Sequence, residues 1–479
     1  MAAKTDTSPE TPDTGTICAA ETVLPAEPDP AAASGPRFCS AACFHAWHRH
    51  QHDEVVTVLH SLDPDRSGGT GVVADWLRCR GGPQNVTQLA LCEFLGYQLP
   101  VLPGSVAERR AIAASLGTVF TAARLTRYAQ LCTAPTTERL LRTYDEDGVP
   151  AGREAYQRAL VGSGIVPPDL PELTWGTTMG EAEVQAYEST AAMLELAVTA
   201  GYLRPGTTGW RVRQVQLTRA YLHADVDGTS RLDAIRTERV EAWSRSRGTG
   251  RRRLVGEVAS RVRAPLAIPS DADESMAPLQ WLLDRAGDGT GVPLDEAYRL
   301  DDSVVAQARQ WFGSDHDGQS LEAVRELLYE LRALRRTGRR LVVTRIGREL
   351  LDDPDRMWAA AVATLVGAAD DLGSVVREAA LMILLGRQAG REELTRRLTE
   401  VAAGDGWLAP DARYEDIRTA LLPLLRRLLA MGLLADERWL RPIRLTPLGQ
   451  AAAVAALRAR AMRPRRTLAV GGPFRPDVR

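Results

Sequence analysis

The densest group of potential metal ligands lies in the segment 38–54, FCSAACFHAWHRHQHDE, which holds two of the six cysteines and four of the seven histidines. Zinc binds four Cys or His side chains in a tetrahedron, and the candidate set here is Cys39, Cys43, His48 and His52. On one straight helix the two cysteines share a face, and these two histidines point away from it. A zinc site therefore needs a turn between Cys43 and His48, or a second chain.

The pattern FCSxxC at Cys39 and Cys43 resembles the second half of a small bacterial zinc motif, in which an upstream CxxC supplies the other two ligands. Only Cys18 precedes the pattern here, so the resemblance covers half of the motif. The alternative interpretation is a solvated helix start that carries histidines and binds no metal. Both interpretations stay open, and zinc is the one cofactor for which the sequence offers candidate ligands.

Several enzyme classes are excluded from the folded part of the chain because Lys4 is the only lysine. A P-loop, a protein kinase and a pyridoxal enzyme each depend on a lysine. GGTGVVA at 68–74 contains GxGxxA but follows no predicted strand, which argues against a dinucleotide-binding turn. Asp-x-Asp-Gly at 145–148, 225–228 and 315–318 lacks the spacing of a calcium loop and predicts tight turns. An enzyme of unknown class is the third and weakest of the functions considered.

Arginine clusters are the main candidate binding residues. One cluster surrounds a predicted turn and strand near residue 338, and another lies in WSRSRGTGRRRL (243–254), whose composition is typical of a flexible basic linker. In a DNA-binding winged helix, one helix reads the major groove and the wing contacts phosphate. The predicted nucleic-acid interface consists of Arg335, Arg336, Arg339, Arg340, Arg251, Arg252 and Arg253.

The helix that precedes the first cluster complicates this hypothesis. It carries Glu322, Glu326 and Glu330, which would repel phosphate. These glutamates can instead pair with neighbouring arginines on a solvated face. Because winged helices also serve as protein-interaction modules, an adaptor that binds a protein partner is the alternative function.

Two stretches of the sequence that position these residues share one order of local signals. Each predicts a helix, a turn, a strand or hairpin, and a second helix that opens at Thr344-Arg-Ile-Gly347 or Thr446-Pro-Leu-Gly449. Thr is a suitable N-cap, Pro suits the first helical position, and the glycines allow close packing of helix and strand. This order is the C-terminal half of a winged helix, a variant of the helix-turn-helix, and predicts tandem units.

A third, weaker copy is expected further upstream. It consists of a helix over about 180–200 that ends at Gly201 and a strand at 210–215. Other predicted helices are 72–77, 86–97, 106–132 with a break near Gly117, and 135–143.

The stretches PLQWLLDRAGDGTG and RLVVTRIGRELLDDPDRMW carry a family resemblance through Trp281, Leu282, Gly287, Asp288, Gly289, 341–344, Gly347, Asp353, Pro354 and Trp358. The region 275–460 resembles a helical, winged-helix-like region in uncharacterised actinobacterial proteins, and 55–220 is similar to it more weakly. That region often accompanies a plasmid-encoded open-reading-frame domain, to which nothing in this sequence is similar. The resemblance implies a fold and leaves the role open.

Length and composition set the remaining limits. At 479 residues the chain predicts about three folded units. Its charge is balanced to -2, so any binding of nucleic acid depends on local patches. Neither an apolar run of about 18 residues nor a signal-peptide core is present. We therefore expect a cytoplasmic protein without a membrane partner.

These observations predict a mostly α fold with tandem winged-helix-like units and small β-hairpins. The expected function is that of a non-enzymatic, DNA-associated regulatory protein. The predicted segments are a disordered acidic, Pro- and Ala-rich tail (1–36), the Cys/His-rich segment (37–54), a helical region ending in a winged-helix-like unit (55–240), a basic linker (241–274), two winged-helix-like units (275–370 and 371–460) and a basic tail (461–479).

Overall fold

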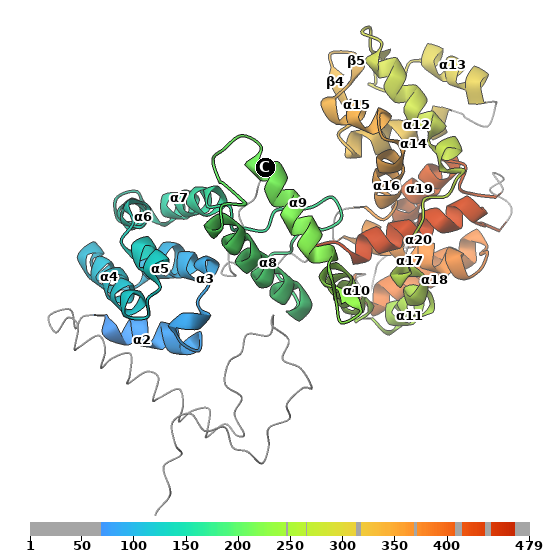
Figure 1. Cartoon of the computed structure of the whole chain (residues 1–479). Helices are drawn as coiled ribbons and strands as arrows, with labels where there is room; N and C mark the ends of the chain where they lie inside the picture. The colour runs from blue at the N-terminus through green and yellow to red at the C-terminus, as the bar shows by residue number, and fades with distance from the viewer. Residues whose placement is uncertain are drawn as a thin grey trace, which may run out of the picture. The chain divides into compact units, whose positions relative to one another are not determined.

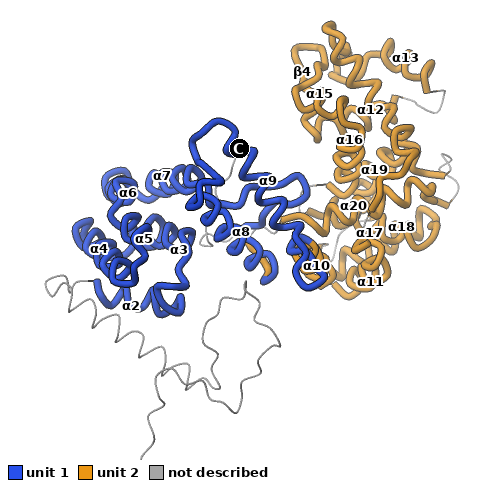
Figure 2. The backbone as a smooth tube through the Cα atoms, viewed as in Figure 1, with its two compact units in different colours: residues 1–177, 181–232, 468–479 blue, residues 178–180, 233–467 orange. Residues whose placement is uncertain are grey.

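The structure is a computed structural model of the chain, which describes residues 69–245, 248–264, 266–312, 318–367, 371–407, 414–435 and 442–464. The described residues are mostly helical with small antiparallel sheets, as the sequence predicts (Figure 1). They divide into two compact units (Figure 2), fewer than the length alone suggests. Unit 1 contains the described residues of 69–177 and 181–232, and unit 2 those of 178–180 and 233–464.

Unit 1 is built from helices and one short hairpin. Its elements are α2 (Thr70–Cys79), α3 (Gln88–Glu93), a π-helical turn (Phe94–Gln98), α4 (Val106–Ala122), α5 (Thr126–Cys132), α6 (Pro135–Glu146), α7 (Gly148–Gly162), α8 (Glu181–Thr199), α9 (Trp210–His223), β1 (Asp225–Val226) and β2 (Thr229–Ser230), with 3-10 turns at Pro83–Asn85 and Leu99–Val101. Local signals explain several of the helix starts. Ser105 and Glu108 form a capping box that starts α4, and Pro135 occupies the first position of α6.

Two sequence predictions in unit 1 are wrong. The break expected near Gly117 lies instead at Arg124, which has a φ of 61° and separates α4 from α5. The strand expected at 210–215 is the first half of α9. Alternation over six residues does not distinguish a strand from a helix. The helix lets the Gln214 side chain donate hydrogen bonds to two backbone carbonyl oxygens of the 164–166 loop, at 2.8 and 2.9 Å.

The predicted tight turns and the helix end at Gly201 are confirmed where the structure describes them. Gly228 has a φ of 84°, and its N–H donates to Asp225 Oδ1 at 2.7 Å in the turn between β1 and β2. Gly148 and Gly201 also have positive φ values of 86° and 77°, which glycine adopts at little cost.

Unit 2 contains two segments with the same order of elements. The first has a helix, a short strand, two helices and a hairpin: α12 (Ala272–Gly287), β3 (Val292–Pro293), α13 (Asp302–Phe312), α14 (Gly318–Glu330), β4 (Leu334–Thr337) and β5 (Arg340–Val343). These strands form an antiparallel sheet in the order β3-β5-β4. α15 (Arg345–Leu351) and α16 (Pro354–Ala363) follow.

The second segment repeats this order with single bridges in place of strands. It comprises α17 (Leu372–Gly386), α18 (Arg391–Gly404), α19 (Tyr414–Ala430) and α20 (Pro447–Ala461). Ala389, between α17 and α18, bridges Ile443, and Leu434, after α19, bridges Leu445. The pairing scheme is therefore that of β3-β5-β4, with the last strand in the middle.

The start of the helix after each hairpin is the same in both segments, as predicted. The Thr344 hydroxyl accepts a hydrogen bond from the Gly347 N–H at 3.1 Å, and Thr446 does the same for Gly449 at 2.9 Å. The backbone N–H of each threonine donates to a carbonyl at the beginning of its hairpin, at 2.9 and 3.0 Å. Pro447 occupies the first position of α20.

The prediction of a linker at 241–274 is wrong, because most of this range is helical. α10 (Arg231–Ser244) runs into it, and α11 (Thr249–Arg263) occupies its centre. α11 packs against α17, α18 and α20 and buries Leu254, Val255 and Val258. One cluster of buried side chains continues from α10 to α20, so the predicted boundary at 370/371 does not separate two cores. No helix among the described residues has the length and apolar character needed to cross a bilayer.

Candidate nucleic-acid interface

The arginine cluster near residue 338 lies on the hairpin of the first segment. Leu334 and Leu341 are buried and fix β4 and β5 to the core. Residues 335–340 are all exposed, and Gly338 makes the turn with a φ of 60°. We call this hairpin, together with the residues that flank it (332–349), the arginine wing.

The side chains of the wing are held in place without losing their charge. The Arg336 guanidinium lies 4.3 Å from the centre of the Tyr298 ring, and Arg340 donates to two backbone carbonyl oxygens before β3, at 2.7 and 3.1 Å. Arg339 Nη1 is 3.9 Å from the carboxylate of Glu296, and both side chains are exposed. Arg345 also pairs with Glu349 at 3.1 Å. Because such exposed pairs are weak and the partners of Arg336 and Arg340 are neutral, the wing keeps a positive field.

The second segment serves as an internal comparison for the wing. Residues 332–349 contain seven arginines and one acidic residue, whereas the equivalent residues 432–451 contain three arginines and two acidic residues. Both segments make the same hydrogen bonds at the ends of the hairpin, so this fold does not require the additional arginines. The residues at equivalent positions are Arg332 and Gly432, Arg335 and Ala435, Arg345 and Pro447, and Arg348 and Gln450.

Arg332 occupies a position where an arginine does not favour stability. It ends α14 in the left-handed conformation, with a φ of 57°, where Gly432 has a φ of 64° in the other segment. A residue with a side chain costs roughly 1 kcal/mol in this conformation relative to glycine. The sequence prediction missed Arg332, Arg345 and Arg348, although alignment of the two segments by their Thr-x-x-Gly signals would have found them.

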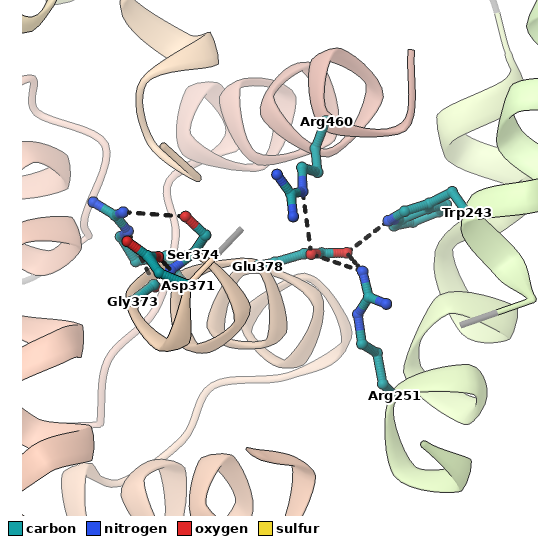
Figure 3. Close-up of polar contacts among 8 residues, drawn as sticks. Trp243, Arg251, Asp371, Gly373, Ser374, Glu378 and Arg460 are labelled. Atoms are coloured by element: carbon teal, nitrogen blue, oxygen red, sulfur yellow. Dashed lines mark hydrogen bonds and ion pairs between the residues drawn. The ribbon is translucent and has the colours of Figure 1, made fainter. Parts of the chain in front are cut away.

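The second predicted cluster does not form a binding surface as a whole. Arg251 lies on α11 with its guanidinium directed inward, and it pairs with Glu378 of α17 at 2.7 Å (Figure 3). The Glu378 side chain has no exposed surface and also accepts a hydrogen bond from Trp243 Nε1 at 2.6 Å. Arg460 of α20 is 3.6 Å from the same carboxylate. The assignment of Arg251 to nucleic-acid binding is therefore wrong, because its charge is used to join α10, α11, α17 and α20.

Arg252 and Arg253, in contrast, are exposed. Arg253 pairs with Glu257 one turn later on α11, at 3.3 Å. They lie on a regular helix and not on the flexible loop that the composition predicted. Two exposed arginines on a helix are an ordinary solvated face, so they add little to the interface.

Two of the three glutamates of α14 are paired, although not in the i,i+4 pairs on a solvated face that the alternative interpretation expected. Glu322 pairs with Arg325 and accepts a hydrogen bond at 2.6 Å from a backbone N–H before α13. Glu330 pairs at 2.7 Å with Arg427, which belongs to α19 and is buried. Glu326 is exposed. The solvent-facing side of α14 is therefore acidic, and a neighbouring helix lies along one of its flanks.

The predicted zinc ligands Cys39, Cys43, His48 and His52 lie outside the described residues, so the zinc site stays a prediction. Within the ranges that are described, no three His, Cys, Asp or Glu side chains are grouped as metal ligands.

Burial opposes the ionisation of three side chains in unit 1. Burial raises the pKa of Cys92 and of Cys132 to about 12. Burial also raises the pKa of Glu93, which directly precedes the π-helical turn. Because the thiolate is the nucleophilic form of cysteine, neither thiol is activated for covalent chemistry.

Comparison with known proteins gives no further assignment. No family model, no curated protein and no solved structure has a significant match to this chain.

Proposed function

We propose that the two segments of unit 2 are winged-helix-like units and that the protein is a non-enzymatic, DNA-associated regulatory protein. The order helix, strand, helix, helix, strand, strand and the sheet order β3-β5-β4 support the fold assignment. In such a unit the hairpin is the wing, which contacts phosphate.

The charge of the arginine wing is the observation that carries the proposal. Seven arginines lie within 332–349, and the equivalent hairpin of the same fold lacks most of them. A two-stranded ribbon fits a DNA groove, and arginine binds phosphate through two parallel hydrogen bonds. Residues 335–340 are exposed and include no large apolar side chain, which favours a polyanion with phosphates on both sides of a groove over an anionic lipid surface.

The test compares the full chain with a wing variant that keeps the fold. Arg335→Gln, Arg336→Gln and Arg339→Gln are combined, and Arg340 is left in place because it holds the backbone before β3. The control combines Arg309→Gln, Arg396→Gln and Arg418→Gln, which remove the same charge from exposed sites on α13, α18 and α19. Binding to mixed-sequence duplex DNA is measured by fluorescence anisotropy over a range of salt concentrations.

We expect the wing variant to bind more weakly and with a smaller salt dependence. Each lost phosphate contact lowers the slope of log K against log salt by about 0.9, so three lost contacts lower it by up to about 2.7. The control should retain most of the affinity. Absence of DNA binding by the unmodified protein at low salt, or equal loss in both variants, contradicts the proposal.

A second candidate is the protein-interaction adaptor. One flank of α14 is covered by α19, and its solvent-facing side is acidic, so that side suits a protein surface better than DNA. If the unmodified protein fails to bind DNA at low salt, the adaptor becomes the first hypothesis.

A further inference from the structure

We propose that the arginine wing binds duplex DNA without reading its sequence, because neither of the two helices that would read bases is available to do so. This inference rests on the proposed function. Sequence-specific winged helices place the helix before the hairpin in the major groove, where three or four side chains reach base edges. The corresponding helices here are α14 and α19.

One flank of α14 is covered by other helices and cannot enter a DNA groove, and its solvent-facing side repels phosphate. Its buried residues span almost half of its circumference and include Ser320, Ala323 and Leu327 beside the usual core positions. α14 packs against both α12 and α19. The residues left toward solvent include Glu322, Glu326 and only one arginine. A helix with this face would approach the phosphate backbone with the wrong charge.

α19 is even less accessible to DNA than α14. From residue 420 to residue 430 every side chain is buried or half-buried, because the helix packs against α14, α17 and α18. Its exposed first turn begins with Tyr414, Glu415 and Asp416, which again is acidic.

The two helices are joined by an ion pair whose arginine is buried. Arg427 of α19 pairs with Glu330 of α14 at 2.7 Å, and its other Nη donates to the Thr364 carbonyl oxygen at 2.8 Å. Arg427 is 7% exposed. Separating the helices to free α14 would take the carboxylate partner away from this buried guanidinium, which is unfavourable.

The arginine wing is the remaining surface that can contact DNA. Its contacts are with phosphates, which position the protein on the duplex. Guanidinium groups on a hairpin neutralise phosphates wherever the backbone passes, and phosphate contacts carry no sequence information. We therefore expect binding to be steep in salt and nearly equal on different sequences.

The experiment uses the full chain and three duplexes of equal length that are AT-rich, GC-rich and mixed. Affinities should agree within about threefold, with parallel salt slopes, and selection from a random-sequence duplex library should enrich no motif. A preference above about a hundredfold for one sequence overturns the inference and leaves the proposed function intact. Failure to bind any duplex refutes the proposed function itself.

A second variant tests the role of α14 directly. Glu326→Gln changes an exposed side chain and leaves the paired glutamates in place. If α14 lies away from the DNA, this variant alters the affinity by less than about threefold, whereas the three wing substitutions reduce it along with the salt slope. An increase above about tenfold, or a new sequence preference, shows that α14 faces the groove and contradicts the inference.

Discussion

Asp405, at the end of α18, is a carboxyl group whose surroundings oppose its ionisation. Burial raises the pKa of Asp405 above its usual value, although the nearby Arg251 favours the charged form. The folded protein therefore binds the proton of this group more tightly than the unfolded chain does. By linkage, the contribution of Asp405 to stability is complete below its unfolded pKa and is lost as pH rises through the folded pKa.

Replacing Asp405 by Asn should remove this pH-dependent loss. We expect Asp405→Asn to be more stable than the unmodified protein at pH 7 and the difference to shrink at acidic pH, where the unmodified carboxyl is protonated. Urea unfolding at several pH values measures the difference. Asp352→Asn, at an exposed position, is the control and should show no comparable trend. A constant difference at all pH values would contradict the assignment.

At the scale of elements, two glycines fix how each hairpin meets its following helix. A Cβ on Gly347 would lie 2.4 Å from the Ala333 carbonyl oxygen, and one on Gly449 would lie 2.1 Å from that of Leu433. These carbonyls accept the hydrogen bonds of Thr344 and Thr446, so they cannot move without loss. The predicted close packing of helix and strand at these glycines is confirmed.

We expect Gly347→Ala and Gly449→Ala each to lower the free energy of unfolding by about 1–3 kcal/mol or more, the usual cost of overpacking. Gly256→Ala is the matched control, because this helical glycine of α11 has no atom within 4 Å of an added Cβ. It should raise stability by about 0.5–1 kcal/mol through helix propensity. Chemical denaturation measures all three, and tolerance of both substitutions in the Thr-x-x-Gly signals would show that the packing is looser than described.

At the scale of the whole molecule, we expect unit 2 to unfold as one cooperative structure although it holds two similar segments. The buried cluster from α10 to α20 is continuous, and α14 and α19 belong to different segments but pack together. Their ion pair is among the polar contacts that a separate unfolding of either segment would break.

A cavity in one segment should therefore loosen the other. Leu424→Ala in α19 removes a fully buried side chain and should cost about 2–5 kcal/mol. Hydrogen exchange of the full chain is expected to show reduced protection in α14 as well as in α19. Thr419→Ala, exposed on α19, should change neither helix. Loss of protection confined to 371–464 would show that the segments unfold independently.

Local signals in the sequence were sufficient for the mostly helical class and for the caps at Thr344 and Thr446. These features depend on neighbouring residues, since a cap or a turn is decided within about four positions. The apparent linker around 251 was misjudged because local composition does not show what a helix packs against. Arg251 points inward because it pairs with the buried carboxylate of Glu378, more than a hundred residues away in the sequence.

The sequence by itself determined which residues are charged, that helices begin after Thr344 and Thr446, and that two segments share one pattern of signals. Only the tertiary structure decided that α14 and α19 cover each other and that Arg251 and Arg427 are internal, whereas the wing arginines face solvent. The physical reason is that a charge costs little on a surface and much in a core. The role of a charged side chain therefore depends on which distant residues the fold brings into contact with it.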